Sequence, residues 1–387
     1  MKHRIKRFQW TQLAVLAIIH FTVDMFAGAL PAILPVLMST FSIRLSLAVG
    51  ILTALNLTAN GVQIIIGHLR HDKKRPAFLQ LGLILSAAVC LLGLLPANPQ
   101  AYPLLIILAI ICGCGVAMVH PEALRAVHKL RRISSAISTT YFLSFGFFGY
   151  AAGGYIAATL VSHLHLPGLY WLFVLPVLAA ITVKFFRIRL SVERKSNAAI
   201  STNAPTERLS FWPIFAVALM GAISTTIIFA LLPTRLNELG FSLTFGGFCY
   251  LAFGLSWSLG SLLWANLARK IGELRSALFA LVAGLPFFFI YFASINSKPA
   301  VLILIIAGSC SPAYFPLMVS LARHAAGMKL GQRMGFIIGG AWGTASLVLL
   351  AVSPLAEHFG LQTVLNWTPL GYLASALIVL SLLRKKS

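Results

Sequence analysis

The chain has 387 residues, of which 59% are apolar and only 10% are charged. Soluble domains carry roughly 25% charged residues, so this composition excludes an ordinary soluble protein. Lys and Arg number 30 against 8 Asp and Glu, a net charge of +22. The basic residues lie between long apolar runs. This pattern indicates that they orient the chain in a membrane rather than bind nucleic acid. The five cysteines all lie inside apolar runs, which argues against a disulfide framework or a zinc site.

Twelve segments are long and apolar enough to cross a bilayer, since a spanning helix needs about 20 largely apolar residues. In chain order the predicted spans are 11–37, 43–69, 76–95, 102–124, 133–161, 169–189, 209–235, 242–268, 275–294, 298–322, 332–355 and 361–383. We therefore predict an all-α integral membrane protein with twelve transmembrane helices. The basic start of the first segment is like that of a signal peptide, but eleven further spans make it the first helix.

The loops between these spans divide sharply by charge. If alternate loops lie on opposite sides of the membrane, 27 of the 30 Lys and Arg residues fall on the side of both termini. Only Arg44, Arg235 and Lys298 fall on the other side. Cytoplasmic loops collect Lys and Arg, so both termini are predicted to be cytoplasmic.

A polar stretch just past the midpoint, rich in Ser, Asn, Thr and Pro, reads as a linker between two similar halves. The predicted domains are an N-terminal six-helix lobe (1–190), a cytoplasmic linker (191–208) and a C-terminal six-helix lobe (209–387). Gly113 and Pro121 recur at the same offset as Gly308 and Pro316, and the fifth and eleventh spans are both rich in glycine. Repeats of this kind are typical of secondary transporters.

Asp24 lies halfway along the first span, where an ionised carboxylate costs about 2.5–3.5 kcal/mol even on the permissive insertion scale. It is therefore expected to face the protein interior. His20 lies four residues earlier on the same helical face, and the pair can share a proton near neutral pH. We predict Asp24 as the proton-coupling residue, with His20 as a second candidate. The alternatives are a structural hydrogen-bond acceptor at Asp24 and a satisfied polar group at His20.

Glu122 and Arg125 lie near the cytoplasmic end of the fourth span and are three residues apart, so they can pair. The matching positions in the second half, Leu317 and Ser320, carry no charge, so packing symmetry does not require the pair. One interpretation is a helix-end ion pair at the surface. The other places Glu122 or Arg125 at the mouth of a cavity, where Glu122 is a proton-coupling candidate and Arg125 attracts anions or neutral amphiphiles over cations.

Further cavity candidates come from polar and aromatic residues within the spans. Asn56, Asn60 and Gln63 share one face of the second span, which should contact another helix or the cavity. The remaining candidates are Tyr141, Thr225, Trp257, Tyr314 and Trp342. No cluster of carboxylates or histidines has metal-ligand spacing at membrane depth, so neither a metal nor a cofactor is predicted.

Two segments resemble a known family. His20-Phe-Thr-Val-Asp24-Met-Phe, with Leu30-Pro31-Ala32-Ile33-Leu34-Pro35 after it, and above all His120-Pro121-Glu122-Ala123-Leu124-Arg125 resemble the fosmidomycin resistance protein group of the major facilitator superfamily. The resemblance implies the major facilitator fold and a bacterial inner-membrane drug exporter driven by proton entry. It also implies that Asp24, Glu122 and Arg125 are among the characteristic charged positions.

The chain departs from the superfamily pattern in two places. In Gly67-His68-Leu69-Arg70-His71-Asp72 the acid stands one place late, and the fifth span carries Gly153-Gly154 where exporters often carry Gly-Pro. Export of drug-like, anionic or amphiphilic compounds is the first hypothesis, and import of a small organic solute or metal chelate is the second. A membrane enzyme is the third and weakest, since the chain holds only two Asp. The expected partners are a small-molecule substrate, protons and the lipid bilayer, with no nucleic acid, and the expected state is a monomer.

The charge asymmetry makes the topology testable by cysteine accessibility. Ile200→Cys, in the predicted cytoplasmic linker, should react with a membrane-impermeant maleimide in inverted vesicles and not in intact cells. Lys298→Cys, on the predicted outer side, is the matched control and should show the reverse pattern. Labelling of position 200 from outside intact cells would contradict the topology.

Overall fold

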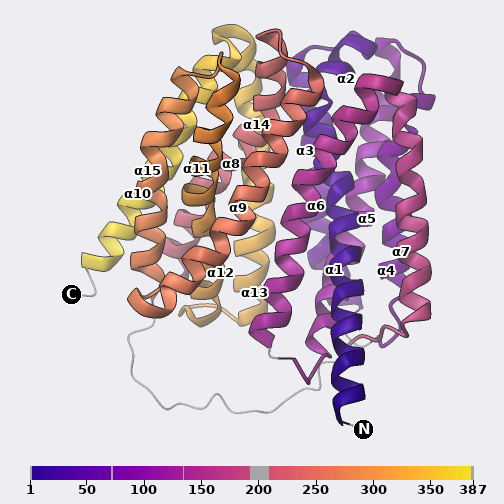
Figure 1. The fold of residues 1–387 in the computed structure, drawn as a ribbon, viewed down its shortest axis with the longest axis vertical. Helices are drawn as coiled ribbons and strands as arrows, with labels where there is room; N and C mark the ends of the chain where they lie inside the picture. Colours follow the sequence, from indigo (N-terminus) through magenta and orange to yellow (C-terminus); the bar gives the residue numbers. More distant parts are fainter. Residues whose placement is uncertain (1, 71–72, 134, 192–208, 385–387) are drawn as a thin grey trace.

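The structure is a computed structural model that describes residues 2–70, 73–133, 135–191 and 209–384. Over these residues it is an all-helical bundle (Figure 1) with twelve helices long and apolar enough to cross a membrane, the number that the sequence predicts. The predicted linker at 191–208 lies, apart from its first residue, outside the described part of the chain.

The helix bounds follow the predicted spans closely. The first half contains α1 (Lys2–Ala32), α2 (Leu34–Phe41), α3 (Leu45–Leu69), α4 (Ala77–Ser86), η1 (Ala87–Leu94), η2 (Pro99–Ala101), α5 (Tyr102–His128), α6 (Ser135–Leu164), η3 (Leu166–Phe173) and α7 (Val174–Phe185). The second half contains α8 (Phe211–Glu238), α9 (Leu243–Ile271), α10 (Glu273–Ala293), η4 (Lys298–Ala300), α11 (Val301–Cys310), η5 (Ser311–Tyr314), α12 (Phe315–His324), α13 (Leu330–Gly335), η6 (Phe336–Gly340), α14 (Ala341–Phe359) and α15 (Leu361–Arg384).

Proline or glycine stands at several of the places where a predicted span is not one regular helix. The first span is interrupted after Ala32, and α2 begins at Leu34 with Pro35 in its first turn. A proline lacks the amide hydrogen that would continue the ladder, but it is tolerated where a new helix starts. The tenth span likewise passes through a short 3₁₀ segment, η5, that contains Pro312. In the eleventh span, η6 is a π-helical turn that ends in two glycines.

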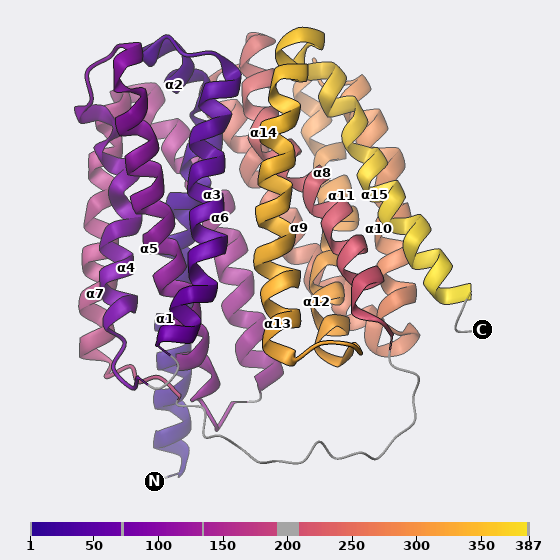
Figure 2. The same ribbon diagram turned by 180° about the vertical axis from the view of Figure 1, so that it is seen from behind.

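The two halves stand side by side, with α6 of the first half along α9 of the second (Figures 1 and 2). We call the end where α1 begins and α15 finishes the terminal end, and the other the opposite end. Hydrogen bonds between described residues of the two halves lie from the middle of the bundle to the opposite end. Glu357 Oε1 accepts from the Ser46 backbone N–H at 2.6 Å, and the Ser162 and Thr244 hydroxyls are 3.0 Å apart.

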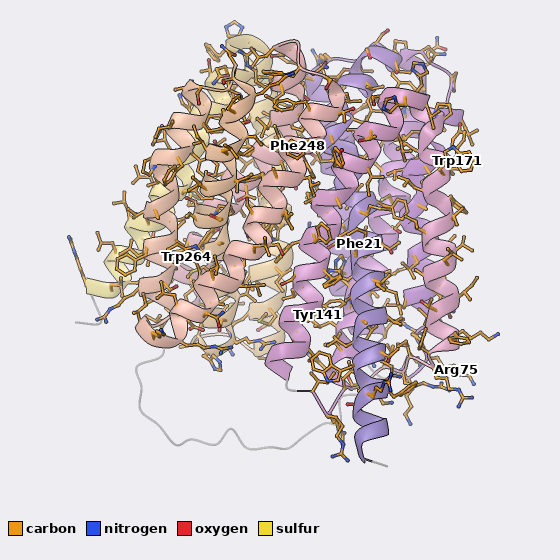
Figure 3. The ribbon with its side chains drawn as sticks, in the orientation of Figure 1. Phe21, Arg75, Tyr141, Trp171, Phe248 and Trp264 are labelled. Carbon is orange, nitrogen blue, oxygen red and sulfur yellow. The ribbon has the colours of Figure 1, made fainter. Side chains whose placement is uncertain are left out.

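Nearer the terminal end, α6 presents side chains that the second half does not cover. Tyr141, low on α6, is 39% exposed, and Figure 3 shows it well below Phe248, which lies near the junction of the halves at the opposite end. Between the exposed Tyr141 and the opposite end, α6 is joined to the second half by the hydrogen bond from the Ser258 hydroxyl to the Ser144 carbonyl at 3.3 Å.

Large apolar side chains cover the outer surface of the bundle. Trp171, Leu263 and Phe185 are each more than two-thirds exposed, and Figure 3 shows Trp171 on the outer edge of the molecule. An exposed apolar surface of this extent would be costly in water and is suited to contact with lipid. The structure therefore describes a multi-pass membrane protein.

The glycines that recur between the halves pack in the same way. A Cβ on Gly113 of α5 would overlap Leu55 and Thr58 of α3, and a Cβ on Gly308 of α11 would overlap residues one turn apart on α9. Matched glycines thus allow matched helix pairs to approach closely. This likeness supports the internal repeat, while the domain limits stay a prediction.

The closest approach between α1 and α6 also depends on glycine. A Cβ on Gly149 would collide with the carbonyl oxygen of Phe21, and a Cβ on Gly153 with that of Met25. Both colliding atoms belong to the α1 backbone, which cannot turn away as a side chain can. The glycine-rich face of α6 therefore sets the distance of α1 from its neighbour.

We expect Gly153→Ala to destabilise the protein by about 1–3 kcal/mol, because overpacking forces two helix backbones apart. Gly61→Ala on α3 is the matched control, since nothing lies within 4 Å of a Cβ at that position and alanine favours helix. Melting temperatures of the two variants in detergent should differ clearly, with only Gly153→Ala below the wild type. Equal melting temperatures would show that the α1–α6 contact is not tight.

Candidate functional site

A cavity of about 210 Å³ lies between the two halves near the middle of the bundle. The first half contributes a polar wall from α1, α3 and α5, which includes Asp24, Asn56, Asn60, Gln63 and His120. The second half and α6 contribute a mostly apolar wall, which includes Phe147, Tyr150, Thr226, Phe229, Trp257, Ile338, Trp342 and Ser346. A site of this composition suits a small molecule with both a polar and an apolar part.

Asp24 lies between two imidazoles at the polar wall. Its Oδ2 is 3.2 Å from Nε2 of His20, one turn earlier on α1, and its Oδ1 is 3.1 Å from Nε2 of His120 on α5. The Asp24 side chain is 15% exposed, that of His20 is 4% exposed and that of His120 is 27% exposed. We call these three residues the His-Asp-His cluster. It lies at the cavity wall, with Asp24 and His120 facing the cavity and His20 behind them.

Backbone contacts hold the two rings in place. Nδ1 of His20 donates to the carbonyl of Phe142 on α6 at 2.8 Å, and Nδ1 of His120 donates to Val116 one turn earlier at 2.9 Å. The carbonyls accept only, so each Nδ1 carries a hydrogen and each Nε2 is directed at the carboxylate. Gly146 completes the setting, because a Cβ there would overlap the His20 ring and Asp24.

The same three residues have donor atoms within 4.8 Å of one another, close enough to hold a metal ion. The spacing of carboxylates and histidines in the sequence predicts no such cluster at membrane depth. This prediction is wrong, because His120 comes from a helix distant in sequence. Each imidazole, however, contacts a separate carboxylate oxygen. Two separate contacts of hydrogen-bond length are an arrangement for sharing protons rather than for converging on one ion.

Five of the predicted cavity residues line the cavity: Asn56, Asn60, Gln63, Trp257 and Trp342. Among the described residues, the side-chain amides of Asn56 and Gln63 have no protein hydrogen-bond partner, while Asn60 donates to the Asn56 carbonyl. The Trp257 ring stacks on Phe147 at 4.6 Å and lies 5.9 Å from the Trp342 ring. Free amides therefore face an aromatic wall across the cavity.

Other predicted cavity residues lie elsewhere. Thr225 is buried and shares a hydrogen bond with the Tyr372 hydroxyl, so that its neighbour Thr226 lines the cavity instead. Tyr314 is buried within the second half and donates to the Ala218 carbonyl at 2.7 Å. Tyr141 is on α6 nearer the terminal end than Phe147 and Tyr150, which line the cavity. Their roles as substrate contacts are not supported by these positions.

Glu122 is neither at a cavity mouth nor at the surface. Its side chain is fully buried, and its ion-pair partner is Arg70, which follows α3 in the chain, rather than the Arg125 that the sequence suggests. Arg70 Nε and Nη2 both lie 2.8 Å from Glu122 Oε1, while Oε2 accepts from the Leu79 backbone N–H at 2.8 Å. The guanidinium carbon of Arg70 also lies over the Phe78 ring, 4.5 Å from its centroid. Glu122 thus fastens the end of α3 and the start of α4 to α5.

Arg125 is likewise outside the cavity lining. Its guanidinium donates to the backbone carbonyls of Arg70, Lys73 and Ser191. These carbonyls belong to the connection between α3 and α4 and to the segment that follows α7. Arg125 therefore ties chain segments together at the terminal end, and the expected preference for anions loses the position on which it was based.

The sequence analysis did not single out several residues of the site. His120 was noted only as part of the His-Pro-Glu motif, although a titratable ring in a predicted span is itself a signal. Arg70 was noted only as part of a basic loop. The aromatic residues Tyr150 and Phe229, whose rings are 5.4 Å apart, had no signal that separates cavity residues from packing residues in one sequence.

We expect Glu122→Gln to lower the melting temperature of the purified protein, because it leaves the Arg70 guanidinium without its charged acceptor. Hydrogen bonds to charged groups are worth about 1.5–3 kcal/mol. Glu238→Gln is the matched control: Glu238 pairs with Arg235 at 3.2 Å but is half exposed, where ion pairs contribute about 0–1 kcal/mol. If both variants melt at the wild-type temperature, the buried pair does not stabilise the fold.

Comparison with known proteins identifies the family that shares this architecture. A model of the Major Facilitator Superfamily matches residues 16–349. The fosmidomycin resistance protein of Escherichia coli (strain K12) is 23% identical over 371 residues, which cover 91% of this chain and 88% of that protein. The MFS-type transporter YfnC of Bacillus subtilis (strain 168) is 24% identical over 365 residues, which cover 90% of this chain and 87% of that protein.

Solved transporter structures share the fold. A POT family transporter in complex with a thioalcohol-conjugated peptide has a TM-score of 0.71 at 14% identity and covers 97% of both chains. A bacterial homologue of the human lysosomal transporter Spinster, in an inward-facing and unoccupied conformation, has a TM-score of 0.69 at 13% identity and covers 96% of this chain and 95% of that one. With the family model spanning most of its length, the chain belongs to the major facilitator superfamily of membrane transporters.

Proposed function

We propose that this protein is a proton-driven exporter of small amphiphilic compounds in a bacterial inner membrane, with both termini in the cytoplasm. The observation that carries the proposal is the His-Asp-His cluster, a titratable group at the wall of a cavity between two halves of a transporter fold. Intramembrane carboxylates and histidines are costly and serve proton relays in transporters. Asp24 is the coupling residue because it touches both imidazoles and the cavity.

The state of the structure fits one stage of such a cycle. The halves are joined from the middle to the opposite end, where Glu357 binds the start of α3. With cytoplasmic termini, the end at which these hydrogen bonds join the halves faces outward, and we infer that the cavity opens inward. In alternating access the two halves rock about the central site, so that the cavity opens to one side at a time. Protons bound from the outside and released inside then drive substrate outward.

The cavity walls suggest the chemistry of the substrate. The rings of Phe147, Trp257 and Trp342 offer an apolar surface on which a planar group can stack. The amides of Asn56 and Gln63 offer both donors and acceptors to a polar group on the other side. A compound with an apolar ring and a polar head meets both walls at once, which is why we infer an amphiphile.

Two features of the proposal rest on the relatives rather than on the site. One relative is named for resistance to fosmidomycin, so this small polar phosphonate is our probe of direction and coupling, whereas the amphiphilic substrate class is inferred from the cavity walls. Export would raise the resistance of cells that express the protein, whereas import would raise their sensitivity. That comparison supports export as our proposal, because alternating access itself works both ways.

Asp24→Asn should abolish accumulation of labelled fosmidomycin against its gradient in inverted vesicles with an acidic interior, because the amide cannot take up and release the coupling proton. Downhill exchange of fosmidomycin should remain. Glu238→Gln, which removes an acid outside the cavity, is the control and should accumulate as much as the wild type. Undiminished uphill transport by Asp24→Asn would show that the coupling site lies elsewhere.

A further inference from the structure

The two contacts of Asp24 fix the number of protons in the His-Asp-His cluster. Both Nδ1 atoms donate to backbone carbonyls, so their hydrogens are already used. Each Nε2 is within hydrogen-bond distance of a separate carboxylate oxygen. A hydrogen bond needs a proton between its two atoms, and without one each contact would set the lone pair of a nitrogen against that of an oxygen.

We propose that the cluster holds two exchangeable protons in this conformation, and that His120 is the residue that carries the second one. With no added proton, a carboxylate and two neutral imidazoles have a net charge of −1. One proton satisfies one of the two contacts and leaves the cluster neutral. A second proton satisfies the other contact and brings the net charge to +1. This deepens the proposed proton coupling and rests on it only for the direction in which protons move.

The groups that surround the cavity indicate that both protons bind to the three residues of the His-Asp-His cluster. The other titratable group that faces the carboxylate is Tyr150 of α6, which also lines the cavity. At the cavity, α3 contributes amides and α8 and α14 contribute hydroxyls, none of which titrates near neutral pH. Imidazole is the side chain that does titrate there.

Proton loss then changes the geometry of the cavity. When the second proton leaves, one nitrogen–oxygen contact becomes a repulsion between lone pairs, and Asp24 and His120 can no longer both keep their positions. His20 is buried and bound to α6, whereas His120 is the more exposed ring and faces the cavity. The contact between α1 and α5 at His120 is therefore the one that opens. Only an N–H bond changes: each proton forms it on arrival from one side of the membrane and breaks it on release to the other, and no bond between heavier atoms is made or broken.

The experiment counts doubly protonated imidazoles without any substrate. Full-length protein labelled with nitrogen-15 at histidine is placed in lipid nanodiscs, and ring nitrogen signals are followed from pH 5 to pH 9. His20→Gln and His120→Gln assign the two rings among the ten histidines of the chain. His358→Gln, on the exposed face of α14, is the control whose loss should leave both cluster signals unchanged. At the acidic end both His20 and His120 should carry hydrogens on both nitrogens.

Asp24→Asn gives the sharpest test of the count. An amide offers one acceptor oxygen and one donor nitrogen, so one ring must stay doubly protonated while the other accepts as a neutral ring. The number of imidazolium signals from the cluster should fall from two to one. The proposal is overturned if the wild type never shows more than one imidazolium in the cluster, or if Asp24→Asn keeps two. Two signals without fosmidomycin transport would sustain the count and remove only the proposed function.

Discussion

The site depends on one face of α6 at which glycines leave no side chains between α6 and α1. Gly149 and Gly153 let the α1 backbone approach α6 so closely that no side chain fits between them, and Gly146 on the same face leaves room for His20 and Asp24. A carboxylate at this depth needs partners, because lipid provides none. The absence of three side chains therefore lets His20 reach the carbonyl of Phe142 and places the acid within reach of His120 on α5. The glycines of α6 thus determine both the packing of α1 and the position of its proton-binding residues.

The fold could be predicted from the sequence almost completely. Twelve apolar stretches of sufficient length leave little choice, because in lipid each must become a helix. The breaks within helices were harder to place, since the first span breaks just before Pro35, whereas Pro31 and Pro354 sit inside continuous α1 and α14. Proline permits a break, and the packing of neighbouring helices decides whether one occurs.

The candidate site could be predicted only where its residues share one helix. His20 and Asp24 are one turn apart, so their contact follows from helix geometry. His120 and Arg70 contact their partners across helices, and one sequence does not encode which helices are neighbours. Thr225 and Thr226 show the limit within a helix: a step of one residue turns the side chain by about 100°, and α8 is apolar all round, so no pattern indicated which of the two faces the cavity.

The two walls of the cavity belong to different moving bodies, and this has a consequence for ligands. Most of the polar groups are on the first half, whereas Phe229, Trp257 and Trp342 are on the second. A molecule that binds both walls bridges the two halves and fixes the distance between them. A higher affinity for both walls then slows the rocking of the halves that would release the molecule. In the proposed cycle we therefore expect flexible compounds to be transported, and rigid compounds that bind both walls tightly to inhibit transport.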